Sequence, residues 1–152
     1  MEWYPKQRFG DLPTEIATRH PDREGLVFED RRYSFSEIKE QVDVAAKALM
    51  AQGVEHGDHV ALWLTNSDDW VFLSFALARV GAVAVPLNTR FRNRDISYVL
   101  NQSDSTFLIT HDRSGPIDYL AMVRDVVQLP ETGDTIKDPN FPKLRKVIIL
   151  GE

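Results

Sequence analysis

The densest group of side chains with binding chemistry is a run of three arginines within five positions, in the segment Thr89-Arg90-Phe91-Arg92-Asn93-Arg94. It follows an apolar run that ends at Leu87 and precedes a helical pattern that begins at Asn93. Guanidinium groups bind phosphates and carboxylates, and parallel sheets bind ligands at the edge where strands end and helices begin. Two interpretations stay open: the segment binds an anionic ligand or a neighbouring domain, or it is a solvated loop.

The remaining polar residues form no recognisable catalytic or metal-binding set. The sequence has no phosphate loop with Gly-Lys-Ser/Thr, no dinucleotide-binding glycine pattern and no Gly-x-Ser-x-Gly elbow. Asp68-Asp69 opens a helical pattern, where carboxylates complement the helix dipole. The histidines lack metal-site spacing, because no two are four apart and Gly57 interrupts the closest pair. They are His20, His56, His59 and His111. We therefore predict no catalytic residue and no metal ligand in this chain.

The composition is that of one globular domain. The chain has 152 residues, 43% of them hydrophobic, and a formal net charge of -5, which gives no general attraction to nucleic acid or an anionic membrane. It has no cysteine, which excludes a disulfide scaffold, a thiolate zinc site and a cysteine nucleophile. Because it shows neither a secretory signal nor an apolar run long enough to cross a bilayer, we expect a cytoplasmic domain without a membrane span.

A hairpin and a long helix are expected in the first third of the chain. The polar turn between residues 26–28 and 33–35 predicts a β-hairpin, and residues 37–52 have the spacing of an amphipathic helix. The N-cap of that helix is expected at Ser36, and Ser34 with Glu37 offers an alternative capping box. Gly53 is expected to end the helix, because glycine enters the left-handed region freely.

Three apolar runs separated by helical patterns follow. Strands are expected at 59–64, 82–87 and 106–110, with helices from Ser67 to Val80 and from the N-cap Asn93 onwards. Strand–helix–strand units of this length form parallel sheets with right-handed crossovers. We therefore predict an α/β fold: a mostly parallel sheet of βαβ units with helices on both faces, plus an N-terminal β-hairpin.

The two ends of the chain carry weaker patterns. Residues 9–19 predict a short helix capped by Asp11, and residues 116–129 predict another helix. A proline-punctuated loop over 130–142 leads to a strand at 146–150. Because a domain seldom ends on an uncovered strand, we expect the sequence to continue in a longer parent protein.

Several segments, in the right order, resemble signatures of the adenylate-forming enzymes. Residues 32–38 are similar to their aromatic-Ser/Thr-aromatic-x-Glu-Leu/Ile pattern, and residues 53–61 to their Gly-Val-x-x-Gly-Asp-x-Val-Ala turn. Residues 78–88 resemble the second family signature as acyl-CoA synthetases carry it, and residues 96–103 and 141–148 follow as the family expects. Over residues 8–150 the chain thus resembles the N-terminal part of an AMP-binding acyl-CoA synthetase or fatty-acid–CoA ligase.

This resemblance implies a reaction in two halves. A carboxylic or fatty acid and ATP give an acyl-adenylate and pyrophosphate, and the CoA thiol then displaces AMP. Residues 1–152 would be the N-terminal portion of the family's large domain, an incomplete subdomain without the phosphate loop and the small C-terminal domain. The parent enzyme would use ATP, Mg²⁺ and CoA, whereas we expect this chain to hold no cofactor and to be inactive alone.

Two alternatives stay open beside this interpretation. One is a fragment of another adenylate-forming enzyme, either a peptide-synthetase adenylation domain or a luciferase-like ligase. The other is a standalone, non-catalytic α/β interaction module. Pro86-Leu87-Asn88 favours CoA ligation, since adenylation domains usually carry Asp in place of Asn88. Thr132-Gly133-Asp134 looks like the family's ribose-binding triplet, but it would precede the phosphate loop, so a surface turn is the better interpretation.

The resemblance also singles out Arg90, because a basic residue near this position in related CoA ligases lies close to the nucleotide part of CoA. The expected partners are the remainder of the parent enzyme and a second copy of this chain. Later sequence would cover the helix Trp70–Val80 in the parent. In the isolated chain, that apolar face and the edge strand Val147–Leu150 would be left to self-associate.

Overall fold

The computed structural model describes residues 8–151, which form two compact units. Unit 1 comprises the residues up to Gly57 together with Ser67–Ala82, and unit 2 comprises Asp58–Asn66 together with the residues from Val83 onwards. Each unit is therefore built from two separate stretches of chain. None of the helices within residues 8–151 has both the length and the apolar character needed to cross a bilayer.

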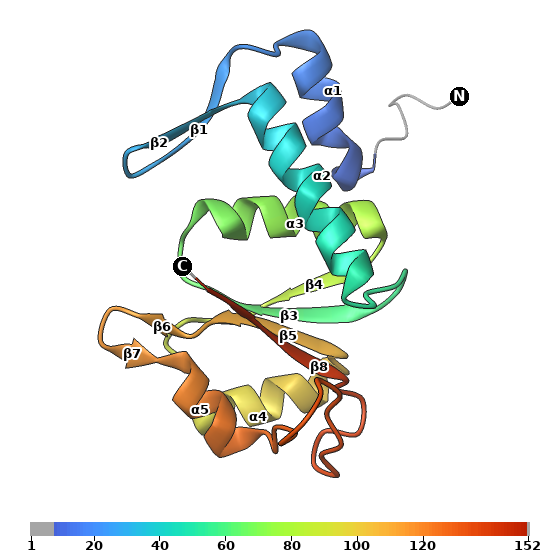
Figure 1. Ribbon diagram of the computed structural model, residues 1–152, viewed down its shortest axis with the longest axis vertical. Coiled ribbons are helices and arrows are strands. Elements are labelled where there is room, and N and C mark those ends of the chain that lie inside the picture. The colour runs from blue at the N-terminus through green and yellow to red at the C-terminus, as the bar shows by residue number, and fades with distance from the viewer. Residues whose placement is uncertain (1–7, 152) are drawn as a thin grey trace. The chain divides into compact units, whose positions relative to one another are not determined.

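Unit 1 consists of helices and the predicted hairpin (Figure 1). Strands β1 and β2 pair antiparallel, and helix α2 packs against both α1 and α3. Val42, Ala46 and Leu49 of α2 are buried, as its amphipathic spacing predicts. The elements are η1 (Phe9–Asp11), α1 (Leu12–Arg19), β1 (Glu24–Phe28), β2 (Arg31–Ser34), α2 (Phe35–Ala51) and α3 (Asp68–Val80).

Serine side chains determine where the two long helices begin. Ser34 Oγ accepts a hydrogen bond from Glu37 N at 3.2 Å, while the Glu37 carboxylate accepts one from Ser34 N at 2.7 Å. The N-cap predicted at Ser36 is therefore wrong and the alternative capping box is confirmed, because this reciprocal pair satisfies two backbone donors at once. Ser67 accepts from Trp70 N and caps α3, as predicted.

Asp11 precedes α1 as predicted, but its side chain does not cap the helix. Its carboxylate binds Arg8 Nε at 2.8 Å and Arg8 Nη2 at 2.9 Å. The hydrogen bond to this guanidinium lowers the pKa of Asp11 from its ordinary value. An ion pair with a nearby arginine has thus replaced the predicted cap.

Arg79 of α3 joins three segments of unit 1. Its Nε donates to Gly10 O at 3.1 Å, its Nη2 donates to Thr14 Oγ1 at 2.8 Å, and its guanidinium forms an ion pair with Asp43 of α2. Gly10 lies so close to α3 that a Cβ on it would stand 2.5 Å from Arg79 N. The arginine of the 78–88 signature is therefore committed to packing within unit 1.

Unit 2 contains a four-stranded, fully parallel sheet in the order β4-β3-β5-β8 (Figure 1). Strand β3 is central, pairing with β4 from His59↔Val83 and with β5 from Val60↔Phe107. This confirms the predicted α/β class with a parallel sheet and a separate hairpin. The strands are β3 (His59–Trp63), β4 (Val83–Pro86), β5 (Phe107–His111) and β8 (Lys146–Leu150).

The helices of unit 2, α4 (Asn93–Gln102) and α5 (Tyr119–Val126), pack on one face of this sheet (Figure 1). Burial of each large apolar side chain in this layer contributes roughly 1.5–3 kcal/mol to stability. The buried cluster between helices and sheet contains Ala61, Trp63, Leu87, Ile96, Leu100, Leu108, Tyr119, Val123, Val127, Ile136, Phe141 and Leu144.

Two local predictions in unit 2 are wrong. The N-cap of α4 is Arg92 instead of Asn93, because the Asp95 carboxylate accepts from Arg92 N at 3.0 Å. The helix predicted from residue 116 begins only at Tyr119, since residues 113–118 turn back as a small hairpin of β6 (Arg113–Ser114) and β7 (Ile117–Asp118). Asp118 caps α5 by accepting from Ala121 N at 2.8 Å, and this hydrogen bond lowers the pKa of Asp118.

Candidate functional site

The carboxyl ends of the parallel strands form one edge of unit 2, and the arginine segment lies there. Strand β3 ends at Trp63, β4 at Pro86 and β5 at His111. The loop of residues 87–92, which we call the arginine loop, follows β4 and leads into α4. This is the edge at which parallel sheets bind ligands. The position predicted for the segment, after a strand and before a helix, is thus confirmed.

Like Arg92, Arg90 is an exposed cation of the arginine loop. Its backbone N–H donates to Asn88 Oδ1 at 2.9 Å, which orders the main chain at this residue. Its guanidinium makes no hydrogen bond or ion pair with any residue between 8 and 151. The side chain is therefore available to an anion, which is the property the predicted role requires.

Two buried aromatic side chains hold the backbone of the arginine loop. Trp63 Nε1 donates to Asn88 O at 3.2 Å, and Tyr119 Oη donates to Thr89 O at 3.5 Å. The Trp63 and Tyr119 rings meet edge to face with their centroids 4.7 Å apart, and neither residue is more than 1% exposed. Burial raises the pKa of Tyr119, which keeps its hydroxyl protonated as a donor.

Sequence reasoning missed these two anchors. The available signal was their chemistry: a buried Trp or Tyr carries one polar group that must find a partner. Nothing in the sequence says that both partners would be neighbouring carbonyl groups of the same loop. That pairing arises because β3 and α5 meet the loop from different parts of the chain.

The other two arginines of the segment serve different purposes. Arg92 Nη1 donates to Phe91 O at 2.8 Å and to Thr89 O at 3.4 Å, so its side chain stabilises the loop itself. Arg94 lies on α4, beside Ser97 and Tyr98 on an open surface of that helix. Of the three, Arg90 alone lies in the arginine loop with a guanidinium that makes no hydrogen bond or ion pair with any residue between 8 and 151.

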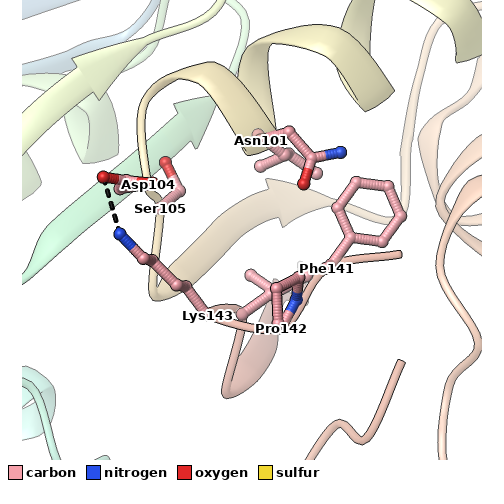
Figure 2. A pocket seen from close by; sticks show the side chains of 8 residues that line it. Asn101, Asp104, Ser105, Phe141, Pro142 and Lys143 are labelled. Atoms are coloured by element: carbon pink, nitrogen blue, oxygen red, sulfur yellow. Dashed lines mark ion pairs between the residues drawn. The ribbon is translucent and has the colours of Figure 1, made fainter. Parts of the chain in front are cut away.

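A small pocket lies between the C-terminal end of α4 and residues 141–144, beyond the opposite ends of the strands (Figure 2). Its volume is about 60 Å³, the room of roughly two water molecules. The Lys143 ammonium forms an ion pair with Asp104 at 2.7 Å beside it (Figure 2). The pocket is too small for a nucleotide or for CoA, and the ion pair ties the segment before β8 to α4.

Other polar residues considered in the sequence have structural partners. His59 Nδ1 lies 2.6 Å from Ser103 O, and the buried Asp68 accepts from Tyr33 Oη at 2.5 Å and pairs with Arg31 at 3.0 Å. In the part of the chain that the structure describes, no group of three or more His, Cys, Asp or Glu could hold a metal ion.

The Thr-Gly-Asp triplet is also tied to the fold. Asp134 pairs with Lys146 at the start of β8 at 2.5 Å, and this hydrogen bond lowers the pKa of Asp134. Because Lys146 binds this carboxylate, the triplet is anchored to the start of β8 and belongs to the loop that precedes this strand.

Asp58, the acidic residue of the 53–61 signature, joins the amino ends of the strands. Its carboxylate accepts from Thr106 Oγ1 at 3.0 Å and forms an ion pair with Arg145, just before β5 and β8. Its carbonyl accepts from Val83 N of β4 at 2.8 Å. Asp58 therefore holds strands of the sheet together. Ser34, Glu37 and Ser67 likewise have structural roles, because they cap the helices α2 and α3.

Comparisons with known proteins agree with this architecture. The family model described as AMP-binding enzyme matches residues 14–149. YngI of Bacillus subtilis is 34% identical over 148 residues, which are 93% of this chain and 27% of that protein. The crotonobetaine/carnitine–CoA ligase of Proteus mirabilis is 34% identical over 130 residues, which are 82% of this chain and 25% of that protein. The chain thus spans about a quarter of the length of these curated relatives.

Solved structures share the fold. The anthranilate CoA ligase AuaEII in complex with anthranoyl-AMP has a TM-score of 0.80 at 23% identity, over 98% of this chain and 26% of that chain. The N-terminal domain of FACL13 from Mycobacterium tuberculosis has a TM-score of 0.76 at 28% identity, over 94% of this chain and 34% of that chain. Since the family model covers most of the chain and the fold agrees, the chain belongs to the AMP-binding enzyme family, as its signatures predict.

Proposed function

We propose that this chain is the N-terminal part of an ATP-dependent acyl-CoA synthetase. The complete protein would join a carboxylic or fatty acid to CoA through an acyl-adenylate, with release of pyrophosphate and AMP. Arg90 is the observation that supports CoA as the acceptor, because it offers an exposed guanidinium at the carboxyl edge of a parallel sheet. Relatives named as CoA ligases support the same class of reaction.

The proposed role of Arg90 is to bind the nucleotide part of CoA. Guanidinium groups form strong, charge-assisted hydrogen bonds with phosphate oxygens. The main chain around Arg90 is ordered by its own bond to Asn88 and by the bond from Trp63 to the same residue, so little loop entropy would be lost on binding. Arg90 thus contributes to affinity for the acceptor and has no part in forming the adenylate.

Exchanging Arg90 for alanine in the full-length protein tests this role. We expect R90A to raise the KM for CoA severalfold while the KM for ATP and that for the acid stay near their original values. A change confined to the acid substrate would contradict the proposal. Arg124→Ala is the matched control, because Arg124 is an exposed arginine of the same unit that lies on α5, outside the arginine loop. R124A should leave all three KM values unchanged.

We further propose that residues 1–152 do not catalyse the reaction alone. Adenylation is an in-line attack of a carboxylate on the α-phosphorus of ATP, which requires donors around the phosphates, Mg²⁺ and a cation on the developing charge. The sequence carries no phosphate loop, so these groups would come from the rest of a longer protein. ATP–pyrophosphate exchange measured with this chain and a panel of carboxylic acids should equal a no-protein control. Exchange that copurifies with the chain would refute the proposal.

A peptide-synthetase adenylation domain is the second candidate. The N-terminal subdomain of NpsA from Klebsiella oxytoca has a TM-score of 0.68 at 27% identity, and an artificial fusion of NpsA is described as an adenylation–PCP di-domain. Asn88 instead favours CoA ligation. Offering the full-length protein either CoA or a carrier protein as acceptor separates the two, and we expect transfer to CoA.

We place the reaction in the cytoplasm, a reducing compartment that the cysteine-free composition fits. Cell fractionation with an antibody against the full-length protein tests this location. Recovery in a membrane or extracellular fraction would contradict it.

A further inference from the structure

Asn88 holds the backbone of the arginine loop at Arg90 and at the residue that follows it. Its side-chain oxygen Oδ1 accepts a hydrogen bond from Arg90 N at 2.9 Å, and its carbonyl oxygen accepts one from Phe91 N, also at 2.9 Å. The second bond closes a turn of residues 88–91, and Arg90 occupies the third position of this turn. Two successive N–H groups therefore donate to the same residue.

The parallel sheet in turn fixes Asn88. Its carbonyl oxygen also accepts from Nε1 of the buried Trp63, at the end of β3, over 3.2 Å. The preceding residue, Leu87, donates its backbone N–H to Leu62 O at 2.9 Å, which continues the pairing of β4 with β3. Buried strands held by such bonds are the segments of a protein that open least readily. Asn88 therefore connects a rigid strand with the turn around Arg90.

The other bonds to the carbonyl groups of this turn do not reach Arg90. Thr89 O accepts from Tyr119 Oη at 3.5 Å and from Arg92 Nη1 at 3.4 Å, and both distances are longer than usual for such bonds. Between residues 8 and 151, Asn88 is the one residue that forms a hydrogen bond with Arg90. The order of the Arg90 main chain thus depends on Asn88.

We infer that Asn88 is a positioning residue for the binding of CoA. This role rests on the proposed function, in which the Arg90 guanidinium binds a phosphate of CoA. An arginine side chain loses rotational freedom when it binds a ligand, and the loss is greater when its main chain is mobile as well. Asn88 restrains that main chain before CoA binds. Because its amide is neutral, it does so without an ion pair that would compete with phosphate for the guanidinium.

Kinetics of the full-length protein test this role. Asn88 is exposed, so Asn88→Ala removes the acceptor for Arg90 N without leaving a cavity in the core. We expect N88A to raise the KM for CoA about two- to tenfold, the effect of one lost hydrogen bond, and no more than R90A does. The KM for ATP, the KM for the acid and the rate of ATP–pyrophosphate exchange should stay near their original values.

A double variant shows whether Asn88 acts through Arg90. If it does, N88A/R90A should have the same KM for CoA as R90A alone, because a residue that only positions Arg90 has no effect once the guanidinium is gone. Additive effects of the two substitutions would overturn the positioning role, since Asn88 would then contribute to CoA binding by itself.

Two further variants serve as controls. Asn88→Ser keeps an oxygen that can accept from the same N–H more weakly, so its KM for CoA should lie between those of the original protein and N88A. N88S also decides the outcome if circular dichroism shows that N88A does not fold. Asn101→Ala removes another exposed asparagine of unit 2, whose side chain donates to Ser97 O in its own helix. N101A should leave all three KM values unchanged.

The results for R90A and N88A separate the two roles. If R90A leaves the KM for CoA unchanged, the proposed role of Arg90 is refuted, and the role of Asn88 with it. If R90A raises this KM and N88A does not, only the role of Asn88 is overturned. Equal increases of all three KM values in N88A would overturn it as well, because Asn88 would then support the fold in general.

Discussion

Tyr33 shows how a single side chain of a family signature acts in the fold. Its hydroxyl donates to the buried Asp68, and its ring meets Phe72 of α3 edge to face with the centroids 5.2 Å apart. Tyr33→Phe keeps the ring but leaves a buried carboxylate with one donor fewer. Hydrogen bonds to charged groups contribute about 1.5–3 kcal/mol, so we expect a loss of free energy of unfolding in that range at neutral pH, measured by urea denaturation.

The hydrogen bond between Tyr33 and Asp68 also predicts how the free energy of unfolding depends on pH. The hydrogen bond to Asp68, followed by burial, raises the pKa of Tyr33 in the folded state above its value of 10.0 in the unfolded chain. The folded state then binds more protons above about pH 10, so stability from this group falls as pH rises past that value. We expect the difference in stability between the original chain and Y33F to narrow as the pH rises above about 10. A constant difference above that pH would contradict this assignment.

Arg79 is the second residue whose geometry yields a prediction. Its guanidinium reaches Gly10, Thr14 and Asp43 in three directions, which the single ammonium group of lysine cannot do. Arg79→Lys should therefore lower the free energy of unfolding by about 1–3 kcal/mol, although the charge is unchanged. Arg94→Lys, at an exposed position of α4, serves as the control and should lie within about 0.5 kcal/mol of the original chain. Equal denaturation midpoints for R79K and R94K would refute the role of Arg79.

At the scale of elements, the start of α2 distinguishes two serines that lie two positions apart. Ser34 caps the helix through Glu37, whereas Ser36 already lies within its first turn. Ser34→Ala should cost about 1 kcal/mol in free energy of unfolding, and Ser36→Ala should be close to neutral. Chemical denaturation of the two variants side by side checks this. A larger loss for S36A than for S34A would show that the helix begins at Ser36 instead.

At the scale of the molecule, each of the two units is composed of segments that are separate in the sequence. Strand β3 belongs to unit 2, yet unit 1 residues precede and follow it in sequence. We expect the segment 83–152 expressed alone not to fold, because β3 lies between β4 and β5 and its loss leaves β4 without a neighbour. Adding the segment 1–82 should restore sheet structure in circular dichroism. A cooperative thermal transition for 83–152 alone would contradict this expectation.

Most of the fold follows from the sequence by itself. Helical and strand periods predicted α2, α3, the parallel strands and the hairpin, because burial of one face imposes those periods on the residues. Gly53 and Gly81 have the positive φ expected after a helix, at 90° and 85°. The signatures also determined the family. The N-cap predictions were wrong where a neighbouring residue competes for the same role. The Asp11 carboxylate binds Arg8 instead of capping α1, and Arg92 takes the N-cap position of α4 that was predicted for Asn93.

Only the tertiary structure decided what the signature residues do. Arg79 and Asp58 proved to be packing and strand-joining residues, because each finds its partners on other segments of its own unit, and Ser34 proved to be the capping residue of α2 through Glu37. The tertiary structure also distinguished the exposed Arg90 from Arg92, whose side chain donates to a carbonyl group of the arginine loop. A sequence pattern records side-chain type and spacing, whereas hydrogen bonds depend on positions in space that segments far apart in the chain create together. The support of the arginine loop by Trp63 and Tyr119 arises in this way.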